Sequence, residues 1–248
     1  YLENAVEVDV DALCDHEGNV VIGGLMEHIE PAGIHSGDSA CCLPAVSLGE
    51  GALGTIREWS RGLALALKVQ GLINLQFAVQ RNAEGEEVAY IIEANPRASR
   101  TVPFVAKATG QPLARIATRL MAGETLQQVG LTAEPQPPLQ TIKEAVLPFR
   151  RFPGADTVLG PEMRSTGEVM GSADSFGMAY AKAELGAGEA LPTTGTVFLS
   201  THNRDKPALV PVAERLAGLG FDLIATSGTA DVLTKAGLTV NAVLKVHE

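Results

Sequence analysis

The chain has 248 residues, of which 46% are hydrophobic and 19% are charged, and its formal charge is −10 at pH 7. This length permits one large domain or two smaller ones, and the composition is that of a globular protein. The negative charge and the lack of a basic cluster argue against nucleic acid and anionic membranes as partners.

The cysteines and the hydropathy pattern indicate a cytoplasmic location. Cys14, Cys41 and Cys42 are an odd set without metal-ligand spacing, so we expect reduced thiols. No apolar run approaches the ~20 residues of a transmembrane helix, and no signal peptide opens the chain. Because the chain begins just before an acidic strand and ends without a closing element, we expect it to be a segment of a longer protein.

The first elements in chain order are two strands, a loop and a helix. The stretch 6–11 alternates valine with glutamate or aspartate, which predicts a strand with one acidic face. Residues 20–26 are expected to return as a second strand, and the loop 31–40 is rich in turn-forming residues. Apolar residues that include Leu53 and Ile56 then mark one face of an amphipathic helix that extends to Leu67.

A β-hairpin is predicted next. The segments 73–79 and 88–93 alternate in character with a period of two, and a polar stretch joins them. If the turn is centred on Glu84 and Gly85, Gln76 lies directly across from Glu93, with Cβ atoms about 4.5–5.5 Å apart. Asn95 shares that face of the hairpin, because side chains two residues apart in a strand point the same way.

The polar residues at the end of this hairpin predict a metal and phosphate site. Two amide oxygens, from Gln76 and Asn95, and the carboxylate of Glu93 form the oxygen set that Mg²⁺ accepts together with substrate phosphates. Arg97 and Arg100 follow directly, and guanidinium groups suit phosphate or carboxylate oxygens. The alternative is a half-buried hairpin whose polar side chains face water, but their convergence at the strand end favours the site.

The middle of the chain contains further helices and strands. Residues 113–121 predict a helix that ends before Gly123, and the prolines of 135–138 predict a rigid elbow. A strand is expected at 143–149, a loop at 153–161 and a helix at 175–185. The stretch Gly186-Ala187-Gly188 has the composition of a domain linker.

After residue 194 strands and helices alternate, which predicts a parallel sheet. Strands are expected at 196–200, 221–225 and 240–246, with the first of them buried, and a helix at 208–219. The turn from Thr226 to Thr229 opens a second helix and offers hydroxyls and free N–H groups to an anion, with Lys206 and Lys245 as added positive charge. The alternative is an ordinary Ser/Thr helix cap.

Several stretches carry a resemblance to the large subunits of the carbamoyl-phosphate synthetase family. They are Val6–Asp11, Met26–Glu30, His35–Ala40, Glu93–Arg97 and Leu159–Glu168. The stretches around residues 35 and 93 are similar to ATP-grasp ligases in general, whereas Leu159–Glu168 and the sheet after it are similar to this family in particular. The resemblance covers essentially the whole chain.

The resemblance implies an α/β fold with two incomplete parts. An α+β ATP-grasp portion would be followed by a doubly wound parallel-sheet regulatory domain of the methylglyoxal-synthase type. The implied boundaries are 1–150 for the C-terminal part of the carbamate-phosphorylating ATP-grasp domain, 151–187 for a connecting segment packed on it, and 188–248 for the N-terminal part of the regulatory domain.

The resemblance also implies roles for individual residues. Gln76, Glu93 and Asn95 would hold two Mg²⁺ or Mn²⁺ ions on the ATP phosphates, with Glu93 bridging the ions. Arg97, with Arg100 near it, would steady the carbamate and the transferred phosphoryl group. The remaining residues of the nucleotide site would be Leu2, Glu7, Gly33, Ile34, His35 and Ser36. An alternative for His35 is a hydrogen-bonded loop histidine without a role in binding.

Further implied ligands are a monovalent cation and allosteric effectors. His28 and Ser39 would assist a K⁺ ion. Lys206, Thr226, Thr229 and Lys245 would bind the phosphate of a nucleotide effector such as UMP or IMP. Glu30, Asp38 and Glu144 would hold ornithine in some members, although acidic loop residues are commonly just solvated.

The implied reaction is the phosphorylation of carbamate by ATP, for arginine and pyrimidine biosynthesis. In this family a glutaminase small subunit supplies ammonia, and the first ATP-grasp half makes carbamate from bicarbonate and ammonia, so a hetero-oligomer is implied. Phosphoryl transfer is largely positioning and charge neutralisation, which fits a site of metal ligands and arginines.

Two departures from the family pattern limit what the chain does alone. The first ATP-grasp half is absent, as are the glycine-rich phosphate loop of the second half and the arginine before it, so we expect weak nucleotide binding and little catalysis. Two alternatives stay open: another ATP-grasp ligase, and a non-catalytic nucleotide-sensing module in which the hairpin is only scaffold.

Overall fold

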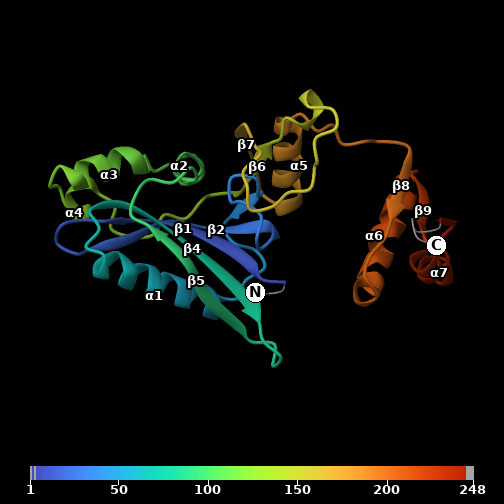
Figure 1. The fold of residues 1–248 in the computed structure, drawn as a ribbon, viewed down its shortest axis with the longest axis horizontal. Coiled ribbons are helices and arrows are strands. Elements are labelled where there is room, and N and C mark those ends of the chain that lie inside the picture. Colours follow the sequence, from blue (N-terminus) through green and yellow to red (C-terminus); the bar gives the residue numbers. More distant parts are fainter. Residues whose placement is uncertain (1, 3, 244–248) are drawn as a thin grey trace. The chain divides into compact units, whose positions relative to one another are not determined.

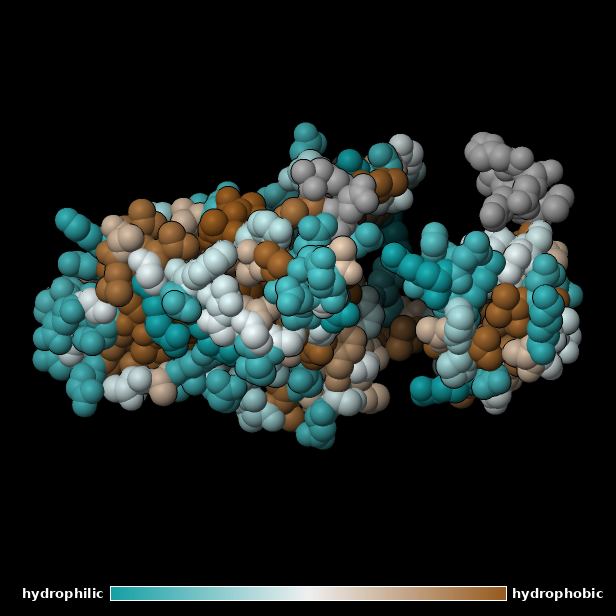
Figure 2. All heavy atoms as spheres, turned by 90° about the horizontal axis from the view of Figure 1, so that it is seen from below, coloured by the Kyte–Doolittle hydropathy of each residue, from teal (hydrophilic) through white to brown (hydrophobic). Residues whose placement is uncertain are grey.

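The computed structural model describes residues 2 and 4–243 and divides into two compact units, residues 1–189 and 190–248 (Figure 1). The division falls beside Gly186–Gly188, the expected linker; Gly186 and Ala187 end a helix and Gly188 is its C-cap. The face of each unit seen in Figure 2 mixes hydrophilic and hydrophobic residues. Among the described residues, no helix is long and apolar enough to cross a membrane.

The first unit is built on a seven-stranded antiparallel sheet with the order β5-β4-β1-β2-β3-β6-β7. Its strands are β1 (Val6–Cys14), β2 (Val20–Pro31), β3 (Cys41–Leu43), β4 (Gly71–Arg81), β5 (Glu87–Asn95), β6 (Gln140–Val146) and β7 (Gly167–Ala173). Its helices are α1 (Glu50–Ala66), α2 (Val102–Thr109), α3 (Leu113–Met121), α4 (Leu126–Val129), the short η1 (Phe149–Arg151) and α5 (Phe176–Ala187). The alternation of strands 6–11, 20–26, 73–79 and 88–93 predicted four of these strands.

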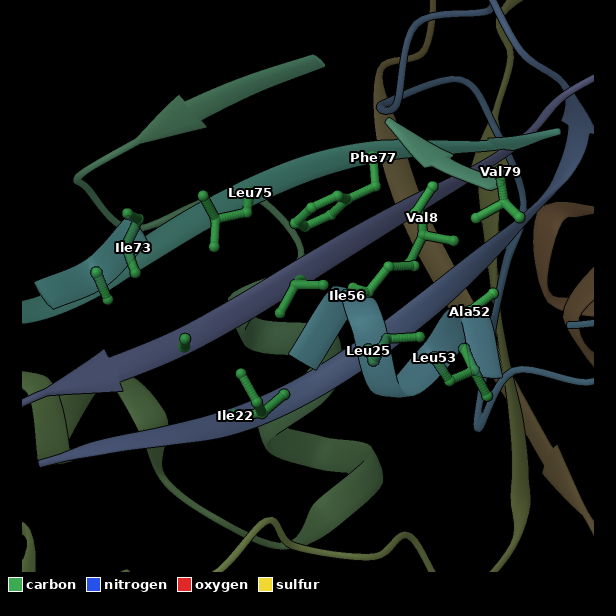
Figure 3. Close-up of a cluster of buried hydrophobic side chains, with 14 of the residues drawn as sticks. Val8, Ile22, Leu25, Ala52, Leu53, Ile56, Ile73, Leu75, Phe77 and Val79 are labelled. Atoms are coloured by element: carbon green, nitrogen blue, oxygen red, sulfur yellow. The ribbon is translucent and has the colours of Figure 1, made fainter. Parts of the chain in front are cut away.

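Two apolar layers hold this sheet between helices, with α1 on one face and α2 and α3 on the other (Figure 1). On the α1 side, Ile56 of the helix packs among Val8, Ile22 and Phe77 of three neighbouring strands (Figure 3). On the other side, Leu113 of α3 belongs to a second buried cluster. The valines of the acidic strand thus face α1, and its acidic residues face the opposite way.

The hairpin of β4 and β5 has the expected pair Gln76↔Glu93, but its turn and its register differ from those expected. Near the turn Arg81 pairs with Glu87, so the turn is centred on Glu84 rather than between Glu84 and Gly85. A β-bulge between the pairs Phe77↔Ile91 and Gln76↔Glu93 adds one residue and restores the expected register. The bulge therefore sets which side chains share the face of Gln76.

The segment 151–187 contributes to the same sheet. β7 pairs with β6 along its whole length, and α5 covers these two strands. Gly171 lies so close to α5 that a Cβ atom there would be 2.3 Å from the Ala179 carbonyl oxygen. The strand expected at 143–149 begins earlier, at Gln140, and ends at Val146, because Pro148 interrupts the strand before η1.

The second unit has a three-stranded parallel sheet with the order β10-β9-β8. Its elements are β8 (Thr196–Leu199), the short η2 (Asn203–Asp205), α6 (Lys206–Gly218), β9 (Asp222–Thr226), α7 (Ser227–Lys235) and β10 (Asn241–Val243). This confirms the predicted parallel sheet. The prediction that β8 is buried was wrong, because Phe198 is 56% exposed and only Leu199 is buried.

Candidate functional site

A cleft of the first unit lies where strands β1, β4 and β5 meet two loops, and its volume is about 390 Å³. Ten of the residues proposed from the sequence line it: Glu7, Gly33, Ile34, His35, Ser36, Gln76, Glu93, Asn95, Arg97 and Arg100. Seven further residues complete the lining: Asp9, Gly37, Asn74, Ser99, Thr101, Pro161 and Glu168. Leu2, which was expected beside the adenine, is not part of this lining.

The acidic face of β1 provides three carboxylates at and beneath the cleft. Glu7 is half-buried and accepts a hydrogen bond from the Gly33 amide at 3.1 Å. Asp9 is 2% exposed and bonds to the His28 Nε2 atom at 2.9 Å. Asp11 is completely buried and bonds to three side chains beneath the cleft.

His28 is buried on β2 between two of these carboxylates. Its Nδ1 atom lies 3.4 Å from Glu7, and its Nε2 atom bonds to Asp9. Burial alone lowers the pKa of the imidazole, but Cys41, Asp9 and Glu7 outweigh it and raise the pKa well above 6.5. The imidazole is therefore engaged with two acidic residues, and its assistance to a K⁺ ion, like that of Ser39, stays a prediction.

The hairpin presents the proposed metal ligands on the cleft side. Glu93 lies opposite Gln76, and the Asn95 amide donates to the Glu93 carboxylate at 2.5 Å. Asn74, two pairs further along and therefore on the same face, lies opposite Asn95. One carboxylate and three amide groups thus occupy adjacent positions on a single face.

This donor set fits a hard divalent cation. Glu93 is exposed, and in the described part of the chain no lysine, arginine or histidine nitrogen lies within 4 Å of its carboxylate. Asn95 donates a hydrogen bond to this carboxylate, but a neutral amide does not neutralise its charge. A carboxylate flanked by amide oxygens and open to solvent suits Mg²⁺, which keeps positions for waters and substrate phosphates.

The two arginines lie on the segment that follows β5. Both side chains are exposed and line the cleft. Arg97 donates to the Ala98 carbonyl at 3.2 Å, and Arg100 contacts the Met163 sulfur. Neither arginine has a carboxylate partner among the residues that the structure describes, so both guanidinium groups remain available to an anion.

The loop from Gly33 to Ser39 forms another wall and is tied to distant parts of the unit. Lys143 of β6 is 1% exposed, and its ammonium donates to the carbonyls of Ser36 at 3.2 Å and Ser39 at 2.6 Å. The Asp38 carboxylate accepts from the Arg164 and Ser165 amides at 2.7 and 2.8 Å. A buried lysine with carbonyl acceptors fixes this loop, because breaking the bonds would leave a charge unpaired.

His35 of this loop lines the cleft, but its ring is engaged locally. Its Nδ1 atom accepts from the Gly37 amide at 3.0 Å, and its own amide donates to the Gly160 carbonyl at 2.8 Å. The stretch from Leu159 to Glu168 thus borders the cleft through Pro161 and Glu168. These hydrogen bonds are those of a loop histidine, and a role for His35 beside a nucleotide stays a prediction.

The three acids proposed for ornithine differ in their surroundings. Glu30 accepts from the Ala40 amide at 2.6 Å, whereas the carboxylate of Asp38 is engaged with the backbone at 164 and 165. One Glu144 oxygen is buried without a hydrogen-bond partner. Burial, with the nearby charges of Glu184 and Glu30, raises the pKa of Glu144 to about 7.

In the second unit, three of the four proposed effector residues gather at the start of α7. The Lys206 ammonium donates to the Gly228 carbonyl at 2.7 Å. The hydroxyls of Thr226 and Thr229 are buried and lie 3.3 Å apart. Lys245, the fourth, lies outside the described residues.

Several residues that line the cleft were not proposed from the sequence, and two of them, Asp9 and Asn74, lie on strands β1 and β4 beneath it. Asp9 was visible in the acidic alternation of β1, and Asn74 lies two residues before Gln76, so both share the periodicity that located their neighbours. Ser99 and Thr101 carried no such signal. Their positions depend on the path of the chain after Pro96, and this segment is neither a strand nor a helix, so no periodic pattern predicts them.

Comparison with solved structures identifies the class of fold. A biotin carboxylase complex from Campylobacter jejuni matches with a TM-score of 0.58 and 17% identity over 77% of this chain and 47% of that chain. The biotin carboxylase domain of a 2-oxoglutarate carboxylase from Hydrogenobacter thermophilus, in complex with MgADP and bicarbonate, matches with a TM-score of 0.51 and 16% identity over 70% of this chain and 43% of that chain. At this identity the likeness shows the fold alone.

The sequence comparisons identify the family. Residues 1–129 match the family described as "Carbamoyl-phosphate synthase L chain, ATP binding domain", and residues 208–248 match the "MGS-like domain". The chain belongs to the first of these families, an ATP-binding domain of carbamoyl-phosphate synthase large chains, and its second unit carries an MGS-like domain. The resemblance stated from the sequence is confirmed.

Curated relatives agree over the whole chain. The large chain of carbamoyl phosphate synthase from Nostoc sp. is 61% identical over 248 residues, which is 100% of this chain and 22% of that protein. The corresponding protein from Methanosarcina acetivorans is 54% identical over 248 residues, 100% of this chain and 23% of that protein. The chain therefore spans about a fifth of the length of these relatives.

Proposed function

We propose that the first unit is the metal- and phosphate-binding part of the site at which a carbamoyl-phosphate synthase large chain phosphorylates carbamate with ATP. The observation that carries this proposal is that Glu93 lies opposite Gln76, with Asn95 bonded to Glu93, on a cleft that two arginines also line. Neither arginine has a carboxylate partner among the residues that the structure describes. In this proposal Gln76, Glu93 and Asn95 would hold two Mg²⁺ or Mn²⁺ ions.

Bound metal ions would neutralise phosphate charge during the transfer. The residues of the chain do the positioning. Arg97 and Arg100 present donors for the carbamate and for the phosphoryl oxygens, and Glu7, held by Gly33 and His28, faces the cleft as an acceptor for ribose hydroxyls. The loop from Gly33 to Ser36 supplies the wall beside the nucleotide.

The wider assignment follows from the family. We infer that the chain works within a large chain whose first ATP-grasp half makes carbamate from bicarbonate and ammonia, and that a glutaminase small subunit supplies the ammonia in a hetero-oligomer. The three described cysteines are free and buried, which fits a cytoplasmic protein. The family match favours this function over another ATP-grasp ligase.

The change Glu93→Gln tests this function. Using the full-length large chain that carries this sequence, we would measure ATP formation from ADP and carbamoyl phosphate with Mg²⁺. Because the amide removes the charge that balances the metal ions, we expect the rate to fall on the order of 100-fold. The loss should be accompanied by weaker Mn²⁺ binding, measured by electron paramagnetic resonance.

Glu84→Gln is the matched control, because Glu84 is an exposed glutamate at the turn of the same hairpin. It removes the same charge and should leave the rate unchanged. A near-normal rate in Glu93→Gln, or no ATP from a well-folded wild-type large chain, would contradict the function and favour a non-catalytic nucleotide-sensing module.

We further propose that the second unit binds the phosphate of a nucleotide effector at the start of α7. The match to the MGS-like domain and the contact of Lys206 with Gly228 support this proposal. Free N–H groups at a helix N-terminus attract anions, and the ammonium adds charge beside them. Lys245 is included in the proposal on the basis of the family resemblance alone.

Lys206→Met tests the effector site. We expect UMP or IMP binding, measured by isothermal titration calorimetry, to weaken about 10-fold, because one ammonium–phosphate contact of about 1.4 kcal/mol is lost. Lys235→Met is the control, since Lys235 lies in the last turn of α7, at the opposite end of that helix from the proposed site. Equal affinities in both variants would exclude Lys206 from the site.

A further inference from the structure

The buried carboxylate of Asp11 joins two parts of the chain that are far apart in sequence. Its Oδ1 atom accepts from the Ser99 hydroxyl at 2.7 Å and from the Asn74 amide at 3.0 Å, and its Oδ2 atom accepts from the Thr101 hydroxyl at 2.7 Å. Asp11 is 0% exposed, and no cationic side chain of the described residues lies within 4 Å of it. The carboxylate is therefore held by neutral donors alone.

Two of these donors lie on the segment that carries the cleft arginines. Residues 97–101 connect β5 to α2, and Arg97 and Arg100 alternate there with Ser99 and Thr101. Within the described chain, two side-chain hydrogen bonds join residues 97–101 to the sheet, and both end on Asp11. The Arg97 amide also donates to the Asn95 carbonyl at the end of β5. Asp11 is thus the side chain of the sheet floor to which this segment is bonded.

Thr101 shows that this arrangement is specific. It directly precedes α2, where a threonine hydroxyl ordinarily accepts from the first turn of the helix. The Thr101 side chain makes no such cap, and its hydroxyl donates to Asp11 and contacts the Ser99 hydroxyl at 2.7 Å. The Thr101 side chain is therefore directed at β1 and not at the first turn of α2.

We propose that Asp11 is a positioning residue that holds the segment 97–101 on the sheet and thereby sets where Arg97 and Arg100 enter the cleft. Asp11 does not itself line the cleft, so it acts through Ser99 and Thr101. The effect on carbamate phosphorylation rests on the function proposed above, whereas the effect on the segment does not. Reactions that depend on positioning lose large factors when donors are displaced by about 1 Å.

The first test uses the 248-residue chain and needs no substrate. Amide hydrogen exchange of residues 97–101 would be compared between the wild type and Asp11→Asn. An asparagine offers one acceptor oxygen where the aspartate offers two, so the segment loses a strong bond, and we expect its exchange to accelerate by at least about 10-fold. Unchanged exchange in a folded Asp11→Asn variant would overturn the proposal.

The matched control is Asp15→Asn. Asp15 is likewise buried, at 2% exposure, directly follows the same strand, and accepts hydrogen bonds from the backbone amides of Asn19 and Leu126. Its loss should lower stability while leaving exchange at 97–101 unchanged, because none of its partners lies in that segment. An equal acceleration in Asp15→Asn would show a general loss of stability and would also overturn the proposal.

A second variant removes the two hydroxyl groups that donate to Asp11. Ser99→Ala combined with Thr101→Val removes both hydroxyls and keeps the arginines. We expect the same acceleration as in Asp11→Asn, and no further acceleration when the three changes are combined, because one interaction is lost in each case. Additive effects would mean that Asp11 does not act through these hydroxyls.

The catalytic readout uses the full-length large chain and ATP formation from ADP and carbamoyl phosphate. Asp11→Asn should lower kcat by about 10- to 100-fold and leave the KM for ADP nearly unchanged, since the arginines serve the transferred group. A normal kcat despite a loosened segment would overturn the positioning role. If the wild type makes no ATP, the proposed function fails, and the exchange experiment alone decides the proposal on Asp11.

Discussion

Three acidic residues two positions apart on β1 occupy three different environments. Glu7 is half-buried at the rim of the cleft, Asp9 is paired with a histidine, and Asp11 is enclosed by hydroxyls and an amide. The alternating pattern predicted their common face but not this order of depth, which depends on how β4 and the segment after β5 cover the strand. The residue-level chemistry of the site therefore follows from neighbours that the local sequence does not contain.

Glu144 gives a prediction for the pH dependence of stability. Its pKa is about 7 in the folded unit and 4.5 in its ordinary state, so the folded protein binds more protons between these values, and stability falls as pH rises through this interval. Burial is the main cause, and the charges of Glu184 and Glu30 add to it, whereas Lys143 opposes it. Glu144→Gln removes the charge, so we expect a higher Tm than the wild type at pH 8 and little difference at pH 5.

The comparison needs a variant with the same charge change elsewhere. Glu162→Gln serves this purpose, because Glu162 is an exposed glutamate of the same unit. Its Tm difference from the wild type should be small at both pH values. If Glu144→Gln shifts the Tm equally at pH 5 and pH 8, the carboxyl group does not titrate in this interval.

At the scale of elements, the β-bulge before Glu93 shows why register is hard to predict. Counting residues from a turn between Glu84 and Gly85 gave the correct pair Gln76↔Glu93, but only because two errors cancelled. The turn is centred on Glu84, which moves every partner on β5 one residue earlier, and the bulge moves the partner of Gln76 one residue later again. Without the bulge, Ile92 would lie opposite Gln76, and Glu93 would point to the other face. A bulge beside a functional carboxylate re-aims its side chain.

The contact between β7 and α5 gives a prediction for stability. A Cβ atom at Gly171 would meet the Ala179 carbonyl oxygen at 2.3 Å and the Ala183 nitrogen at 2.5 Å. Because these are backbone atoms of α5, the whole helix must shift, and we expect Gly171→Ala to lower the free energy of unfolding by about 3 kcal/mol. Urea denaturation would measure the change.

Gly167→Ala is its control on the same strand, because a Cβ atom there has no neighbour within 4 Å among the described residues. It should change stability by no more than about 0.5 kcal/mol. A Gly171→Ala variant as stable as Gly167→Ala would mean that α5 is not packed against β7 in solution.

At the scale of the whole molecule, some segments were predictable from their own pattern and others were not. Alternation predicted β1, β4 and β5, the returning stretch 20–26 predicted β2, and the sequence of strands and helices after residue 194 predicted the parallel sheet of the second unit. The strands β3 and β7 and the helices α2 and α4 were missed, since they take their pairing and packing from the rest of the fold. The Asp11 contacts were out of reach for the same reason, because they link positions 88 and 90 residues apart.

The two bonds from Asp38 to residues 164 and 165 have a consequence for how the cleft can be divided. They span 126 and 127 residues, and the cleft residues themselves run from Glu7 to Glu168. No short contiguous piece of the chain contains the metal ligands, the loop beside them and the opposing wall together. Folding of the whole unit offsets the entropic cost of closing these long loops. The cleft therefore forms only when the whole unit folds, and a short segment transferred to another protein would not reproduce it.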